Sequence, residues 1–246
     1  MEPWSLAIAA LGLALGGVLK GATGAGSPVI GVPVLVLLYD VPLAVAIFTL
    51  PNLLSNIWQG WAYRKSQISR RFTVIFALAG AIGAGIGSLL LAFLPGEALM
   101  GGVAAMVFLY ILFRLARPGW RLEEPLALRL VAPVGLIGGV MQGAGGISAP
   151  VSVSFLNAMK LDRPAFIATI SVFFTAMALV QVPALAGLGI LTPERALLSL
   201  AAMVPLIGAM PLGSWLARHV SRESFDRIIL VLLAAIAARL LYQAMP

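Results

Sequence analysis

Long apolar segments alternate with short polar loops along the whole of this chain. Each segment is long enough to cross a bilayer core of about 30 Å. The segments cover residues 5–38, 42–62, 72–93, 98–115, 130–158, 164–186, 196–217 and 227–244. This pattern predicts an all-α polytopic membrane protein whose eight segments form two sets of four.

A glycine-rich break interrupts the first segment of each set. Residues 16–29 read GGVLKGATGAGSPV and residues 138–151 read GGVMQGAGGISAPV, so a shift of 122 positions superimposes them. Over residues 16–59 and their mates, 12 of 44 positions are identical, including Gly21/Gly143, Gly24/Gly146, Pro28/Pro150 and Gln59/Gln181. The chain is therefore a duplicated unit. Paired Gly/Pro-interrupted segments at matching positions of two halves indicate a transporter's binding site.

The apolar arms on either side of each break are short. The arms cover residues 6–20 and 28–38 in the first half, and 130–142 and 150–158 in the second. At about 1.5 Å per residue they would reach only about 15 to 23 Å. We therefore predict two hairpins of short helices, each meeting near mid-membrane.

The distribution of Lys and Arg tests this arrangement, since cytoplasmic loops collect them. Loops 63–71, 114–129, 159–163 and 218–227 contain 13 basic residues, and all lie on one face if both hairpins return to the side they entered. A single crossing at each break would distribute them over both sides. The count therefore predicts inverted repeats, residues 1–118 and 130–246, joined by a cytoplasmic linker 119–129. Both termini would lie outside the plasma (inner) membrane.

Composition supports a lipid environment and excludes several classes of function. The chain is 61% hydrophobic and 10% charged, with a net charge of +7 and no cysteine. In a soluble protein that charge would suggest nucleic acid, but here the basic residues lie in short loops, so no nucleic-acid partner is expected. The lone His219 lies in a charged loop, and no metal or other cofactor is predicted. No Lys or Arg precedes the first apolar run, so we expect no cleavable signal.

All nine acidic residues fall at segment ends or in loops. No carboxylate is placed at mid-membrane to bind a cation or to relay protons, which favours an anion as substrate. There is no paired carboxylate, metal-ligand cluster or Ser/His/Asp set, so the protein is not expected to be an enzyme.

The breaks themselves predict an anion site. Ser27 followed by Pro28 is typical of an N-cap and first helical residue, and Ser148 to Pro150 start the matching helix. Two helix N-termini would then point inward, each offering free N–H groups and a positive dipole end to an anion. Lys20, the only ionisable side chain deep in an apolar run, could add a full charge. The alternative is that Lys20 snorkels to an interface.

Other polar and small residues allow two interpretations. Asn52, Asn56 and Gln59 share one helical face and could line a pathway, or could simply hydrogen-bond neighbouring helices. Asp40 and Asp162 are predicted N-caps of the helices that follow them. Glycines at near-helical spacing are predicted to be close-packing contacts without a substrate role: Gly80, Gly83, Gly87, Gly208 and Gly213.

The block GATGAGSPVIGVPVL, its second copy GAGGISAPVSVSF, the Asp-x-Pro after each and the four-plus-four layout resemble the sulfite exporter TauE/SafE family, also called the sulfonate uptake permease group. The resemblance covers nearly the whole chain. It implies an integral plasma-membrane permease for sulfur-containing anions such as sulfite, thiosulfate, sulfoacetate or other organosulfonates. Gln142 replaces Lys20 in the second copy, so the two hairpins are not expected to do identical work.

Together these observations predict a secondary anion carrier that works by alternating access around a site between the two hairpins. The alternatives are an uncoupled anion channel and a non-transporting membrane scaffold subunit. The sequence does not determine whether the anion is imported or exported, which ion is coupled to its transport, or whether the protein forms a homo-oligomer. The candidate substrate-binding residues are Lys20, Thr23, Gly24, Gly26, Ser27, Asn52, Asn56, Gln59, Gln142, Gly145, Gly146, Ser148 and Gln181.

Overall fold

A computed structural model describes residues 3–116, 121–219 and 222–244, and within these ranges the regular structure is entirely helical. Glu2 and Arg117, which entered the charge analysis, lie outside the described residues, as do positions 119 and 120 of the predicted linker. The helices are α1 (Pro3–Thr23), α2 (Ser27–Leu38), α3 (Val41–Ala62), α4 (Arg70–Phe93), α5 (Gly96–Ala116), α6 (Glu124–Gly145), α7 (Ala149–Ala158), α8 (Arg163–Gly187), α9 (Pro193–His219) and α10 (Arg222–Ala244), with a 3-10 turn η1 at Arg64–Ser66.

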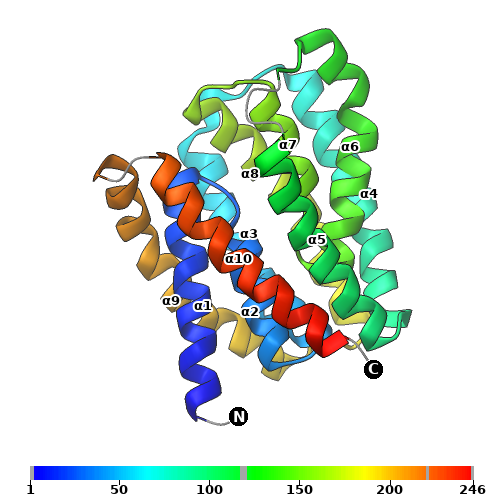
Figure 1. Cartoon of the computed structure of the whole chain (residues 1–246). Helices are drawn as coiled ribbons and strands as arrows, with labels where there is room; N and C mark the ends of the chain where they lie inside the picture. The colour runs from blue at the N-terminus through cyan, green and yellow to red at the C-terminus, as the bar shows by residue number, and fades with distance from the viewer. Residues whose placement is uncertain (1–2, 117–120, 220–221, 245–246) are drawn as a thin grey trace.

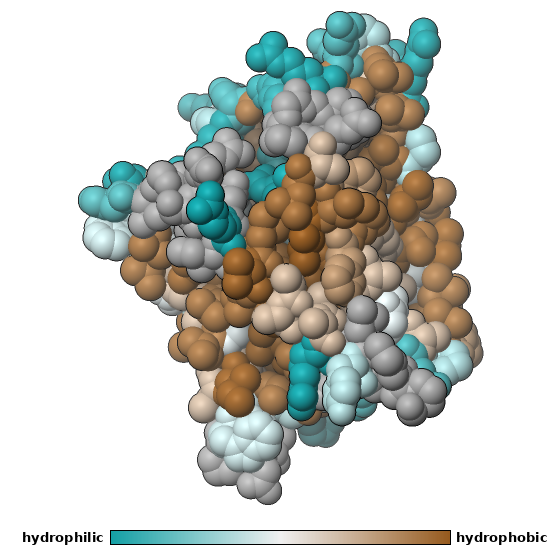
Figure 2. Space-filling view, viewed as in Figure 1, coloured by the Kyte–Doolittle hydropathy of each residue, from teal (hydrophilic) through white to brown (hydrophobic). Residues whose placement is uncertain are grey.

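Seven of these helices are long and apolar enough to cross a membrane. Large apolar side chains face outward from them; Trp61 is 68% exposed, Phe93 77% and Val204 75%. Figure 2 shows brown, hydrophobic side chains over the middle of the molecule and most of the teal, hydrophilic ones toward its upper end. Such a surface is stable only against lipid, which confirms the prediction of an all-α polytopic membrane protein.

Both breaks are present, but the predicted arm lengths are wrong for the first arm of each hairpin. Helix α1 has 21 residues and α6 has 22, so at about 1.5 Å per residue each is long enough for a full crossing. Only the second arms are short, with 12 residues in α2 and 10 in α7. We call residues 24–26, which join α1 to α2, the first elbow, and residues 146–148, which join α6 to α7, the second elbow.

The helices pack in a reciprocal pattern. Helix α1 packs on α9 of the other half, and α6 packs on α4; α3 contacts α8, α5 contacts α10, and α2 and α7 contact α10 and α5. Exchanging α1–α5 for α6–α10 leaves this set of pairs unchanged, as duplication requires. In Figure 1, α1 runs upward from the N-terminus and α6 runs downward, while both chain ends lie at the lower end.

Glycine makes the two reciprocal pairs possible. A Cβ on Gly17 or Gly21 of α1 would overlap backbone atoms of α9, and a Cβ on Gly139 or Gly143 of α6 would overlap backbone atoms of α4. The backbones of α1 and α9, and those of α6 and α4, are therefore in direct contact. Membrane helices gain packing energy from such close approach, because they have no hydrophobic effect to drive their association. The packing role is confirmed for Gly80, Gly83, Gly87 and Gly213 but is wrong for Gly208, where a Cβ would have no other atom within 4 Å.

Both predicted aspartate caps are confirmed. The backbone N–H of Leu43 donates to Asp40 Oδ1 at 2.7 Å, and that of Ala165 donates to Asp162 Oδ1 at 2.9 Å. Each carboxylate therefore satisfies a free N–H in the first turn of α3 or α8. These caps fix where the chain turns back after each hairpin.

We expect Gly139→Ala to lower stability although alanine favours helices. The new methyl would meet the backbone of Gly80 and Ala84, and such overpacking typically costs about 1 to 3 kcal/mol. Gly101→Ala in α5, where nothing lies within 4 Å, is the control and should gain up to about 1 kcal/mol. Thermal unfolding in detergent measures both. Equal melting temperatures for the two variants would contradict the close packing of α4 and α6.

Candidate functional site

The first elbow is a sharp turn that only glycine adopts easily. Gly24 and Gly26 have φ angles of 85° and 88°, in the left-handed region. The hydroxyl of Thr23 lies 2.9 Å from the carbonyl of Leu19 and 2.6 Å from that of Ala25, and these contacts hold the turn in place. The predicted N-cap at Ser27 is wrong by one position, because Gly26 is the N-cap and Ser27 is the first helical residue.

Hydrogen-bond donors remain free at this elbow. The hydroxyl of Ser27 is buried without a partner, at a residue that is 1% exposed. Within the described residues, the backbone N–H groups of Gly26 and Ser27 also have no acceptor. Buried donors are almost always paired in proteins, so a cluster of unpaired ones at a helix N-terminus marks a place for an acceptor from outside the chain.

The second elbow is more enclosed. Gly146 has a φ of 72° and its N–H donates to the carbonyl of Gln142 at 2.8 Å. Ser148 is the N-cap of α7, as predicted, but its hydroxyl lies 3.1 Å from that of Ser152 instead of capping the helix. The side-chain oxygen of Gln142 is buried without a partner. Val32 and Val45 of the first half cover Gly146, and Met106 covers Gly145.

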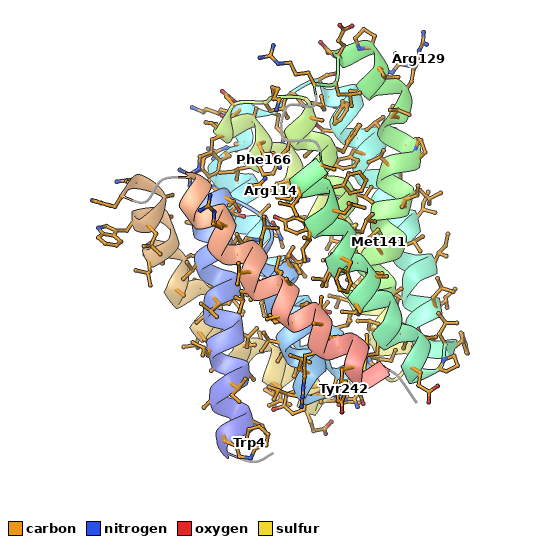
Figure 3. All side chains as sticks on the ribbon, in the orientation of Figure 1. Trp4, Arg114, Arg129, Met141, Phe166 and Tyr242 are labelled. Atoms are coloured by element: carbon orange, nitrogen blue, oxygen red, sulfur yellow. The ribbon has the colours of Figure 1, made fainter. Side chains whose placement is uncertain are left out.

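One cavity of about 1090 Å³ reaches the first elbow. Thr23, Ala25 and Gly26 line it on one side, and α5, α7 and α10 line the others. Figure 3 shows Arg114 and Phe166, both lining residues, in the upper half of the molecule. Among the described residues that line it, four are basic and none is acidic; the basic ones are Arg114, Lys160, Arg163 and Arg227.

Lys20 does not line this cavity. The residue is 1% exposed, and its Nζ donates to Ser55 Oγ and Asn56 Oδ1, both at 3.0 Å. The side chain therefore points from α1 to α3 within the protein, so the snorkelling alternative is wrong. Lys20 lies in the turn of α1 that precedes the elbow, and its neighbours Leu19 and Thr23 do face the cavity.

The predicted amide residues are buried and bond between or within helices. Asn56 Nδ2 donates to Asn52 Oδ1 at 2.8 Å, which extends the Lys20 contact along α3. Gln181 Nε2 donates to the carbonyl of Gln142 at 3.2 Å, linking α8 to the end of α6. Gln59 is 4% exposed and its side-chain oxygen has no partner. Of the 13 predicted residues, the cavity brings together Thr23 and Gly26. The other eleven do not line it, although Ser27 directly follows Gly26 in the chain.

Two residues of the site were missed from the sequence. Ser55 is an acceptor for Lys20, and Arg163 Nη2 donates to the carbonyl of Gly21 at 3.1 Å. The sequence does distinguish Ser55, because its repeat mate is the apolar Met177. The repeats therefore differ at Ser55 as they differ at Lys20, whose mate is Gln142. Arg163 was counted only as a loop charge, and nothing in the sequence connects it with Gly21.

The chain matches the family described as "Sulfite exporter TauE/SafE" over residues 8–240. It therefore belongs to that family and is a membrane transporter of the sulfite exporter type. No curated protein and no solved structure matches it. The resemblance drawn from the two glycine-rich blocks is confirmed.

We expect Asn56→Leu to lower the free energy of unfolding by about 1 to 3 kcal/mol, because it removes one of two acceptors from a buried amine. Adding Lys20→Met should recover most of that loss, since two apolar side chains leave nothing unpaired. Thr49→Val is the control, because its hydroxyl bonds only within α3, to Val45. Denaturation of purified protein followed by circular dichroism measures this. A double variant less stable than Asn56→Leu alone would contradict the pairing.

Proposed function

We propose that this TauE/SafE transporter is a secondary carrier of sulfur-containing anions such as sulfite, thiosulfate, sulfoacetate or other organosulfonates, and that it works by alternating access. The observation that carries this proposal is the set of unpaired donors at the start of α2, placed beside a cavity lined by basic side chains. An oxyanion supplies the acceptors that these donors lack.

The chemistry of the first elbow suits a tetrahedral oxyanion. The hydroxyl of Ser27, the amides of Gly26 and Ser27 and the positive end of the α2 dipole all favour negative charge. Glycine at position 26 leaves room for the anion to approach the backbone. The basic cavity wall raises the local concentration of anions and guides them inward.

The remaining predicted residues take supporting places in this proposal. Lys20 places a cation one layer behind the elbow, near the anion but outside the cavity. Gly24 packs on Ile167 of the other half, so it ties the elbow to α8. Gln142, Gly145, Gly146 and Ser148 form the second elbow, which we propose receives the anion when the halves move. Asn52, Asn56 and Gln181 hold the two elbow helices against α3 and α8. Gln59 keeps an unpaired side-chain oxygen on the same face of α3 as Asn52 and Asn56.

We further propose that residues 1–118 and 130–246 are inverted repeats in the plasma membrane, with both termini outside and the linker 119–129 in the cytoplasm. Reciprocal packing of the halves and the opposite directions of α1 and α6 in Figure 1 support this arrangement. Figure 3 shows Trp4 and Tyr242 at one end of the molecule and Arg129 at the other, where positive charge gathers.

Purified protein in liposomes tests the function. Saturable flux of sulfite, thiosulfate or methanesulfonate with counterflow supports a carrier. Non-saturating electrogenic current would show a channel instead. Absence of flux for all three anions would overturn transport of sulfur oxyanions by this protein.

We expect Ser27→Ala to weaken anion binding about tenfold, because a hydrogen bond to a charged group is lost. The melting temperature should not fall, since this hydroxyl has no partner in the protein. Ser88→Ala is the matched control: its hydroxyl donates to Ala84 within α4, so binding should be unchanged. Calorimetric titration with thiosulfate measures both. Unchanged affinity in Ser27→Ala would remove Ser27 from the site.

The chain contains no cysteine, so single cysteines report topology without background. We expect Lys65→Cys, in the turn after α3, to react with a membrane-impermeant maleimide only after cells are opened. Glu97→Cys, at the start of α5, should react in intact cells. The reverse pattern would contradict the proposed orientation, and labelling of both from one side would contradict the crossing of α4.

A further inference from the structure

The amine of Lys20 is buried among neutral oxygens. Its two acceptors are not free to donate in return: Ser55 Oγ donates its own hydrogen to Pro51 O at 2.5 Å, and Asn56 Nδ2 donates to Asn52. Both therefore accept from Nζ, at 3.0 Å. The partners of Lys20 are thus oriented for an amine, and neither carries charge.

The number of acceptors matches a neutral amine. A neutral amine has two N–H groups and an ammonium has three. The structure gives Nζ two acceptors among the described residues, so protonation adds one N–H that the surrounding helices do not satisfy. An ammonium here needs a partner that the protein alone does not supply.

No carboxylate faces this amine from the described helices around it. Helices α2 and α3 have no ionisable residue between Ser27 and Leu38 or between Val41 and Ala62. Helix α8 brings the cation of Arg163 to the carbonyl of Gly21, the residue next to Lys20. On α9, which contacts α1 through Leu206 and Met210, the charged residues lie at the two helix ends: Glu194, Arg195, Arg218 and His219. A buried cation without a counter-ion is costly, and a second cation nearby adds to the cost.

The second half shows that an elbow does not need this lysine to fold. Gln142 stands in place of Lys20, and Met177 and Ala178 stand in place of Ser55 and Asn56. The lysine and its two acceptors thus occur together in one half and are absent together from the other. A charge that only one elbow has, with partners provided for it, indicates a function beyond packing.

We propose that Lys20 is a proton-binding site that couples anion transport to proton transport. This inference rests on the proposed function and adds the coupling ion to it. When the anion occupies the first elbow, the lone pair of the neutral amine takes a proton from hydronium in the water of the open side, so that one N–H bond forms, one O–H bond breaks and a water molecule is released. After the halves rock, the anion leaves and the proton returns to water on the other side.

Electrostatics makes the two binding events depend on each other. The anion at the start of α2 supplies the negative charge that the ammonium lacks, and the ammonium strengthens the positive field at the elbow. By linkage, the factor by which the proton raises anion affinity equals the factor by which the anion raises proton affinity. The two therefore travel together, as cotransport in the same direction requires.

The test uses full-length protein in liposomes, with the membrane potential clamped at zero by potassium and valinomycin. Methanesulfonate is the probe because it stays a monoanion over the working pH range, so its own protonation does not contribute. A gradient of one pH unit should drive accumulation of about tenfold at one proton per anion. Wild-type protein that shows counterflow but ignores the gradient would overturn this inference and leave the carrier intact. Wild-type protein without counterflow would overturn both.

Two variants separate coupling from binding. Lys20→Gln makes the first elbow like the second, and Asn56→Asp places a permanent counter-ion beside the amine, so that it stays protonated throughout the cycle. We expect each to keep counterflow at saturating methanesulfonate and to lose at least most of the tenfold accumulation. Lys20→Gln should also bind the anion more weakly, because it lacks the positive charge near the elbow. Arg64→Gln removes a charge that lies over Trp61, away from the elbow, and should respond like wild type. If the Lys20→Gln protein does not insert into liposomes, the Asn56→Asp variant alone tests the coupling. Accumulation equal to that of wild type in either folded variant would overturn the proposal.

Discussion

Backbone groups at a helix end inside a membrane have no water to bond, and the rest of this structure depends on how they are satisfied. At the end of α1, the carbonyl of Lys20 accepts from Gly24, and the carbonyl of Gly21 accepts from Arg163 and Ser214. At the end of α6, the carbonyl of Gln142 accepts from Gly146 and Gln181. These carbonyls at the ends of α1 and α6 are therefore satisfied by the protein itself. The N–H groups of Gly26 and Ser27 at the start of the next helix have no such partner, and that difference supports the proposed anion site at the first elbow.

The same constraint explains why distant helices meet at defined points. Pro51 has no N–H to offer the carbonyl of Ile47, so Ser199 of α9 donates to that carbonyl at 2.8 Å and accepts from the N–H of Leu50. The backbone hydrogen bond that is missing at Pro51 in α3 is thus replaced by a contact with the other half. Arg163 acts similarly between α8 and α1. In the proposed cycle such contacts can exchange as the halves move, because each joins a single side chain to backbone groups.

The sequence predicted those features that repeat and those that are local. Duplication located both elbows, and the caps at Asp40 and Asp162 followed from an Asp before Pro. The length of α1 was underestimated because Gly21 was taken as the beginning of the break. In the structure α1 continues through Gly21, since backbone packing on Met210 outweighs the weak helix propensity of glycine. The partners of Lys20 were not predicted because they lie 35 and 36 positions away, and no local pattern joins α1 to α3.

The two elbows, although they belong to repeated halves, differ in how they meet the cavity. The first elbow borders the cavity through Ala25 and Gly26, whereas Val32 and Val45 cover Gly146 of the second elbow. The residues that cover the two elbows match in the repeat: Val45 packs on Gly146, and its repeat mate Ile167 packs on Gly24. Gly24 and Gly146 are thus covered alike, and we propose that a change in the tilt of the halves exchanges access between the two elbows. One end state of the proposed cycle requires this asymmetry, and rocking the halves about α3 and α8 would exchange the open elbow for the closed one.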